Sequence, residues 1–101
     1  MDPDKPDLFD ISDVVISTAG HDKGEIFYVV STDDQFLYLA NGKDRILDKP
    51  KRKKRRHVQK VLRSETRVAQ KLASGDKVLN SELRRDLAYI AREMQANNLG
   101  G

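Results

Sequence analysis

Short runs of β-branched and aromatic residues, separated by turn residues, fill the first half of this chain and constrain its fold more than any other feature. The runs are VVIS (14–17), EIFYVVS (25–31), FLYLA (36–40) and a weaker DRIL (44–47). Runs this short, bounded by Gly, Asn and Asp, are typical of a small all-β unit. Because a flat sheet would leave unpaired strand edges, we expect these strands to close into a small barrel.

A turn and a last strand complete the expected barrel. The pair Asn41-Gly42 predicts a type I′ hairpin turn, in which both central residues have a positive φ. Farther along, HVQKVL (57–62) can alternate inward apolar residues with outward polar ones, which predicts the closing strand. Five short strands suit a mainly β, SH3-like barrel with a C-terminal helical extension, and we place this barrel over residues 12–63.

The expected strands carry most of the aromatic residues. Phe27 and Tyr28 are neighbours in one strand and must face opposite ways, which predicts one in the core and the other at the surface. Phe36 and Tyr38 share a face of the next strand. Surface aromatics can stack on the bases of a single-stranded nucleic acid, but for most of these residues we expect core packing instead.

The two ends of the chain differ from the strand region. The N-terminal stretch MDPDKPDLFD is rich in Pro and Asp and holds only Leu8 and Phe9 as large apolar residues. Such a segment buries too little apolar surface to offset the entropy lost on ordering it. We therefore expect a disordered acidic arm over residues 1–11, and the Asn and Gly residues of 97–101 predict a disordered tail.

From Ser64 the apolar spacing changes from that of strands to that of helices. Ser64 is a candidate N-cap of a first helix that ends near Gly75. A second helix begins at Asn80 or Ser81 and repeats apolar residues at helical spacing. These residues are Leu83, Leu87, Ile90 and Met94. The segment 64–96 is thus a predicted helical pair, whose apolar stripe either packs within the molecule, as we expect by default, or binds a partner.

Charge is distributed unevenly along the chain. Of the net charge of +3, residues 1–48 contribute −7, residues 49–63 contribute +9 and residues 64–101 contribute +1. The middle segment holds no Asp or Glu, and its densest part is KPKRKKRRH (49–57). Such a run predicts contact with phosphates, and because bound counterions are released, the affinity should fall steeply with rising salt.

Three interpretations of residues 49–57 compete. Their composition matches a nuclear localisation signal, although that pattern is weak by itself. They could also form a solvated linker without a function, but linkers seldom concentrate one sign of charge between two strands. Contact with RNA is the interpretation we favour, because the barrel would hold the run at both ends.

A glycine-rich loop separates the first two runs, within DVVISTAGHDKGEIFYVV (13–30). Glycines let the backbone approach a phosphate closely and expose N–H donors, and a lysine adds a cation. The stretch resembles the KOW motif, in which an acidic residue opens an apolar strand and a Gly-x-Asp-Lys-Gly loop leads to a second strand. The matching residues are Asp13, Gly20, Asp22, Lys23 and Gly24.

The resemblance extends over residues 12–62, through FLYLANGK and the Pro-led Lys/Arg run. It looks like the KOW ribosomal proteins of the archaeal and eukaryotic large subunit, and more closely like their small bacterial relatives. Membership would imply an RNA-binding SH3-like barrel that acts on the ribosome, in its assembly or in translation, with ribosomal RNA and ribosomal proteins as partners. The predicted RNA-binding residues are Gly20, His21, Lys23, Gly24, Lys43, Lys49, Lys51, Arg52, Lys53, Lys54, Arg55, Arg56, His57 and Lys60.

Other functional classes find little support. The chain has no Cys and two His, which excludes disulfides and thiolate metal sites and leaves little for any metal or cofactor. Its Asp and Glu residues fall mostly in turns and in the arm, so we expect no catalytic site. The first residues lack the pattern of a signal peptide, and no apolar run is long enough to span a bilayer. We expect a cytoplasmic monomer without membrane contact.

A protein-interaction adaptor is the alternative from another functional class. In that case the barrel or the helical stripe binds a protein, and the basic run serves as a cellular address or a nonspecific anchor. Salt dependence separates the two hypotheses, because a grip on phosphates weakens with salt. An association that survives ribonuclease would favour the adaptor.

Overall fold

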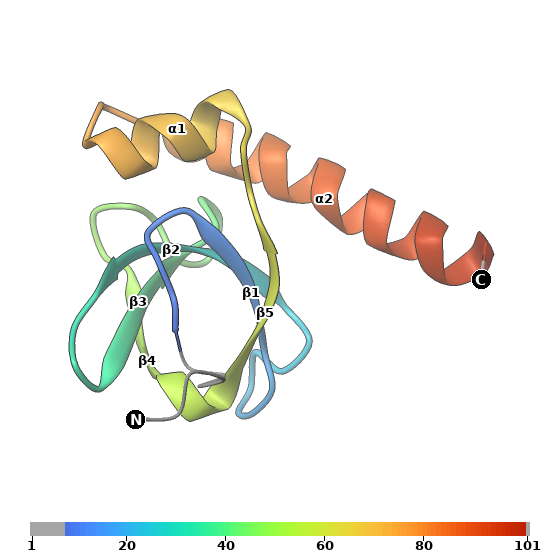
Figure 1. Cartoon of the computed structure of the whole chain (residues 1–101), viewed down its shortest axis with the longest axis horizontal. Helices are drawn as coiled ribbons and strands as arrows, with labels where there is room; N and C mark the ends of the chain where they lie inside the picture. The colour runs from blue at the N-terminus through green and yellow to red at the C-terminus, as the bar shows by residue number, and fades with distance from the viewer. Residues whose placement is uncertain (1–7, 101) are drawn as a thin grey trace.

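The computed structural model describes the backbone of residues 8–100 and the side chains of residues 8–96. Its elements are β1 (Asp13–Ser17), β2 (Ile26–Thr32), β3 (Phe36–Ala40), β4 (Lys51–Lys54), η1 (Arg55–His57), β5 (Val58–Arg63), α1 (Arg67–Ser74) and α2 (Asn80–Gly100). The five strands form one antiparallel sheet in the order β4-β3-β2-β1-β5. Both helices lie at one end of the strand region, above the sheet in Figure 1.

The sheet is buried on two sides, and the alternation of side chains along each strand divides the core in two. The inner cluster consists of Phe9, Val15, Phe27, Val29, Leu37, Leu39 and Val58. The outer cluster, between the sheet and the helices, consists of Val14, Tyr28, Ala40, Ala69, Leu83, Leu87 and Ile90. Phe27 and Tyr28 are therefore both buried, and the expectation that one of them lies at the surface was wrong because the helices cover the second side.

The two edges of the sheet are β4 and β5, which the short helix η1 connects in sequence. Within the described residues, no strand pairing joins β4 to β5. The established architecture is thus an open five-stranded antiparallel sheet with two helices. Closure into an SH3-like barrel stays a prediction.

The strand expected at 44–47 does not form. Residues 41–50 make a series of turns, in which the side-chain oxygen of Asn41 accepts the N–H groups of Lys43 at 2.9 Å and Arg45 at 3.0 Å. A side chain that bonds its own neighbouring backbone in this way competes with strand pairing. The fourth strand is β4, inside the basic run, and it pairs along β3.

The pair Asn41-Gly42 also differs from its prediction. Only Gly42 has a positive φ, of +77°, so no type I′ turn is formed. The Gly42 carbonyl accepts a hydrogen bond from Nη1 of Arg84 at 2.6 Å, and a Cβ at this position would overlap the backbone carbonyl of Asn80. The glycine is needed because the turn lies directly against α2.

Parts of both predicted flexible ends are ordered. Phe9, within the expected arm, is 8% exposed and packs in the inner cluster, whereas residues 1–7 lie outside the described residues. The backbone of 97–100, within the expected tail, continues α2, and residue 101 lies outside the described residues. The packing of Phe9, together with the ion pair between Asp10 and Arg63, holds this segment against the sheet.

The helices begin and end close to their predicted positions. Thr66, not Ser64, is the N-cap of α1, and its hydroxyl accepts the N–H of Ala69 at 3.1 Å. Gly75 ends α1 in the left-handed conformation. The apolar stripe of α2 packs on the sheet, as expected by default. No described helix is both long enough and apolar enough to cross a membrane.

A buried hydroxyl network joins the helices to the sheet. Tyr28 Oη donates to a carboxylate oxygen of Asp86 at 2.5 Å and lies 2.8 Å from Ser64 Oγ. Thr66 Oγ1 donates to the same oxygen of Asp86 at 2.6 Å. Burial, with a further contribution from the Asp86 hydrogen bond, raises the pKa of Tyr28 to about 12. The phenol therefore stays protonated and acts as a donor.

Candidate nucleic-acid interface

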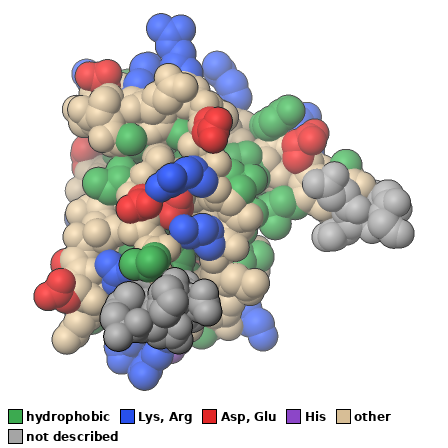
Figure 2. All heavy atoms as spheres, viewed as in Figure 1, with side chains coloured by type: hydrophobic (Ala, Val, Ile, Leu, Met, Phe, Trp, Pro, Cys, Tyr) green, Lys and Arg blue, Asp and Glu red, His purple; other side chains and the backbone are tan. Residues whose placement is uncertain are grey.

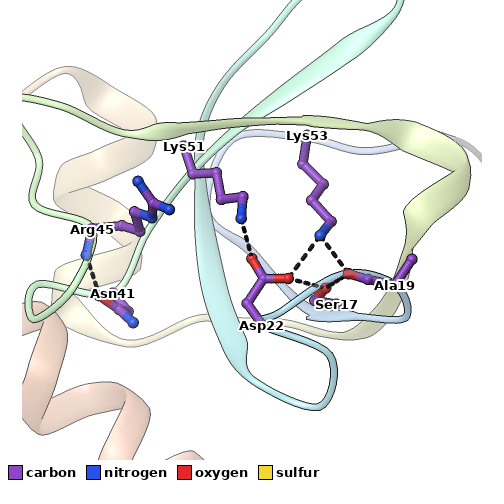
Figure 3. A network of polar contacts seen from close by, with 7 residues as sticks. All are labelled: Ser17, Ala19, Asp22, Asn41, Arg45, Lys51 and Lys53. Carbon is purple, nitrogen blue, oxygen red and sulfur yellow. Dashed lines mark hydrogen bonds and ion pairs between the residues drawn. The ribbon is translucent and has the colours of Figure 1, made fainter.

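The alternation of β4 divides the basic run into inward and outward cations. Lys51 and Lys53 point inward to Asp22, with their Nζ atoms 2.8 Å from Oδ2 and 2.7 Å from Oδ1 (Figure 3). Lys53 is only 8% exposed. Arg52 and Lys54 alternate with them and are exposed. The structure thus directs only half of the strand's charge toward solvent.

Asp22 ties the glycine loop to β4. Its Oδ1 also accepts a hydrogen bond from Ser17 at 2.7 Å, and Lys53 donates in addition to the carbonyl of Ala19 at 2.6 Å (Figure 3). Burial by itself would raise the pKa of Asp22, but hydrogen bonds from Lys51, Lys53 and Ser17 outweigh it and hold the pKa well below its ordinary value. The ionised carboxylate therefore holds loop and strand together at neutral pH.

The glycine loop is exposed, and some of its backbone donors are used within the loop. Gly20 and Gly24 have φ values of +88° and +93°. The N–H of Lys23 donates to the Gly20 carbonyl at 3.2 Å, and that of Gly24 donates to the Ser17 carbonyl at 2.8 Å. These two donors are not available to a phosphate, contrary to the expectation for the loop. The side chains of His21 and Lys23 are exposed on this loop.

The basic run continues through η1, directly beside the loop. The N–H of Thr18, at the start of the loop, donates to the His57 carbonyl at 2.9 Å. Arg55 and His57 are half-buried, and Arg55 Nη2 donates to the Asp33 carbonyl at 2.7 Å. Arg56 is exposed. Figure 2 shows Lys and Arg side chains gathered at the lower edge of the molecule, where η1 lies in Figure 1.

The cations of β5 have carboxylate partners within the molecule. Lys60 Nζ lies 3.1 Å from a carboxylate oxygen of the fully buried Asp13. Arg63 pairs with Asp10 and lies near the other oxygen of Asp13. By contrast, neither Lys54 nor Arg56 makes an ion pair within the described part of the chain. The predicted contact residue Lys60 thus has an internal partner.

Two predicted contact residues lie in the turns of 41–50. Lys43 and Lys49 are exposed there. This segment borders the glycine loop across a hollow whose lining includes His21, Glu25, Asp44, Arg45 and Lys51. The hollow carries charges of both signs, so it does not extend the uniformly basic surface of β4 and η1. No group of His, Asp or Glu in residues 8–96 is arranged to hold a metal ion.

Two features of the site were missed by sequence reasoning. One is the pairing of Asp22 with both inward lysines. Its only signal in the sequence was the presence of an acidic residue within the glycine loop. The other is the position of Phe36 and Tyr38, which are half-buried and belong to neither apolar cluster. Their spacing of two residues signalled a shared face but not that the helices leave it uncovered.

No model of a known protein family and no curated protein matches this chain. The relation to KOW proteins therefore remains a resemblance carried by the motif residues of 13–24. In the structure these residues form β1 and the exposed glycine loop, and they place Asp22 against β4.

Proposed function

We propose that this chain is a KOW-type RNA-binding protein that acts on ribosomal RNA, in the ribosome, in its assembly or in translation. One observation carries the proposal. The segment from β4 through η1, which Asp22 links to the glycine loop, exposes Arg52, Lys54 and Arg56, and residues 49–63 contain no carboxylate. A cluster of exposed cations on an ordered element, without acidic residues among them, is typical of a surface that binds phosphates.

The inward lysines have a different role in the proposed mechanism. Lys51 and Lys53 neutralise Asp22 and fix β4 against the glycine loop. The outward cations are thereby held on an ordered strand, so RNA binding costs less conformational entropy than it would for a flexible tail. Arginine adds bidentate contact with phosphates, which lysine does not provide.

The proposed SH3-like barrel is supported by the strand order. The edge strands β4 and β5 follow one another in sequence and are separated only by η1, which has three residues. So short a connection keeps the two edges of the sheet close together at that end. The strands also surround a common inner cluster that draws residues from β1, β2, β3 and β5.

The alternative hypothesis is an adaptor that binds a protein through the barrel or the helical stripe, and the stripe is not accessible. Leu83, Leu87 and Ile90 are 0%, 5% and 6% exposed, because the stripe of α2 is packed on the sheet. A partner could bind this stripe only after the helix had left the sheet. The RNA-binding proposal needs no such rearrangement.

Salt-dependent binding of a labelled ribosomal RNA fragment tests the proposal. The double variant Lys54→Gln, Arg56→Gln should flatten the plot of log affinity against log salt concentration by about two units, roughly one for each phosphate that no longer meets a cation. The matched control Lys77→Gln, Arg85→Gln removes the same charge from exposed positions of the helical segment. It should leave the slope nearly unchanged. An absence of binding at low salt, or equal effects of the two double variants, would reject the proposal.

A further inference from the structure

The outer side of β3 carries two aromatic side chains that the helices leave uncovered. Leu37 and Leu39 belong to the inner cluster, so Phe36, Tyr38 and Ala40 face the other side of the strand. Ala40 lies beneath the helices in the outer cluster. Phe36 and Tyr38 lie farther along β3, toward the β2–β3 turn, which points away from the helices in Figure 1. Both remain partly open to solvent.

Two exposed cations lie beside these aromatics on the same side of the sheet. In the pairing of β3 with β4, Lys54 is opposite Phe36 and Arg52 is opposite Tyr38. The guanidinium carbon of Arg52 lies 4.5 Å from the centre of the Phe36 ring. A guanidinium stacked on an aromatic ring presents its own outer plane to solvent, and such a plane can stack on a base.

The β2–β3 turn holds the Tyr38 ring in place. Tyr38 Oη donates to one carboxylate oxygen of Asp33 at 2.7 Å, and the other oxygen accepts the N–H groups of Gln35 at 2.9 Å and Phe36 at 2.8 Å. The oxygens of Asp33 are occupied by these three donors. The ring is therefore positioned before any ligand arrives.

We infer that bases of a single-stranded RNA segment stack on Phe36, Tyr38 and the guanidinium of Arg52, while Lys54 and Arg56 contact the adjoining phosphates. The inference rests on the proposed RNA binding and adds that the bound RNA segment is single-stranded. Sites for single-stranded nucleic acid combine aromatic stacking surfaces with a positively charged track along the backbone. Phe36 and Tyr38 are two residues apart on one strand, which separates them by about 7 Å. A duplex keeps its base faces stacked inside and cannot use this surface.

Leucine variants of the full chain test the stacking directly. Phe36→Leu and Tyr38→Leu remove the rings without changing charge. Each should weaken binding of a labelled single-stranded oligoribonucleotide by about fivefold or more, as expected for the loss of a stacked base. The slope against salt should stay unchanged, because every cation that meets a phosphate is still present. Tyr89→Leu is the matched control, since Tyr89 is 56% exposed on α2.

The second part of the binding experiment uses the same RNA annealed to its complement. Binding of the duplex should be insensitive to both leucine variants but should still weaken in Lys54→Gln, Arg56→Gln. If wild-type protein binds the single strand and both leucine variants behave like Tyr89→Leu, the stacking inference is wrong while the proposed function stands. If neither RNA form binds at low salt, the proposed function itself fails.

A fluorescent reporter covers the case in which a leucine variant does not fold. The chain has no Trp, so Phe36→Trp introduces a single Trp that can be excited apart from the Tyr residues, and it keeps an aromatic ring. Its emission should be quenched by single-stranded RNA at concentrations that saturate binding, and that of Tyr89→Trp should not. Equal emission changes at the two positions would overturn the inference.

Discussion

The network around Asp22 and the network around Asp86 both join segments far apart in sequence, yet they use different chemistry. Asp22 is paired with two ammonium groups from β4. Asp86 accepts hydrogen bonds from the neutral hydroxyls of Tyr28 and Thr66. The first network links the glycine loop to the basic strand, and the second links the helices to the outer side of the sheet.

The difference shows how each end of the molecule is organised. Buried ion pairs stabilise a fold only when every charge keeps its partner, because an uncompensated buried charge is costly. Hydroxyl donors carry a smaller desolvation cost, so the helical end depends more on apolar packing and close contact. We therefore expect the stability of the basic end to be most sensitive to the loss of a charged group. The stability of the helical end should be most sensitive to an added group at a tight contact.

Loss of a buried ammonium group should have the largest effect. Lys53→Met leaves Asp22 with a reduced set of partners, and it should lower the free energy of unfolding by about 3 to 4 kcal/mol. Urea unfolding followed by circular dichroism measures this change. In the double variant with Asp22→Asn, the two losses should be less than additive, because both act on one interaction.

Acid titration provides an independent readout for the same variant. Because the pKa of Asp22 is held below its ordinary value of 3.8, the wild-type network is at full strength above that pH and is lost as the pH falls below it. Lys53→Met should lose less stability over this acidic range than wild type. Parallel pH profiles for the two proteins would contradict the assigned role of the pair.

The same substitution, Gly→Ala, can be made at the helical end and in the glycine loop, and the losses of stability can be compared. Gly42 and Gly24 both have a positive φ, but a Cβ at Gly42 would overlap the Asn80 carbonyl, whereas nothing lies within 4 Å of one at Gly24. Gly24→Ala should cost about 1 kcal/mol for its backbone conformation alone. Gly42→Ala should cost about 2 kcal/mol more, because α2 must also shift. Equal losses in thermal or urea unfolding would show that the turn does not press on the helix.

Removal of one hydroxyl from the helical network should have the smallest effect. Tyr28→Phe should lower the free energy of unfolding by about 1 to 2 kcal/mol, because a buried hydrogen bond to a carboxylate is removed. Since the pKa of Tyr28 is raised from 10.0 to about 12, its stabilisation is present below pH 10 and is lost as the pH rises toward 12. The variant should lack this alkaline loss. Tyr38→Phe, which removes an exposed hydroxyl, serves as the control and should lose much less stability.

The strands of the first half could be read from the sequence because their apolar residues alternate or run together. β1, β2, β3 and β5 lie within a residue or two of their predicted positions, and the stripe of α2 predicted its buried face. β4 could not be predicted in this way, because KRKK contains no apolar residue. Its strand conformation comes from pairing with β3 and from the counter-charge of Asp22.

The candidate site was predictable in its location but not in the roles of its members. The sequence placed the basic run beside the glycine loop, and the ion pairs from Asp22 to β4 bring the two together. It could not tell Lys53, which is buried, from Lys54, which is exposed. Neighbouring lysines are chemically identical, so only the direction of each side chain on the strand separates an anchor from a contact residue.

Charge segregation, short alternating strands and a helical stripe were determined by the sequence alone, because each depends on the order of residues and on local backbone geometry. The tertiary structure decided which cations face solvent, why Tyr28 is fully buried on the second side of the sheet, and why Phe36 and Tyr38 are only half-buried. These outcomes depend on where the helices end over the sheet and on which carboxylate lies opposite β4. Both are set by contacts between segments far apart in the chain, and no local pattern encodes them.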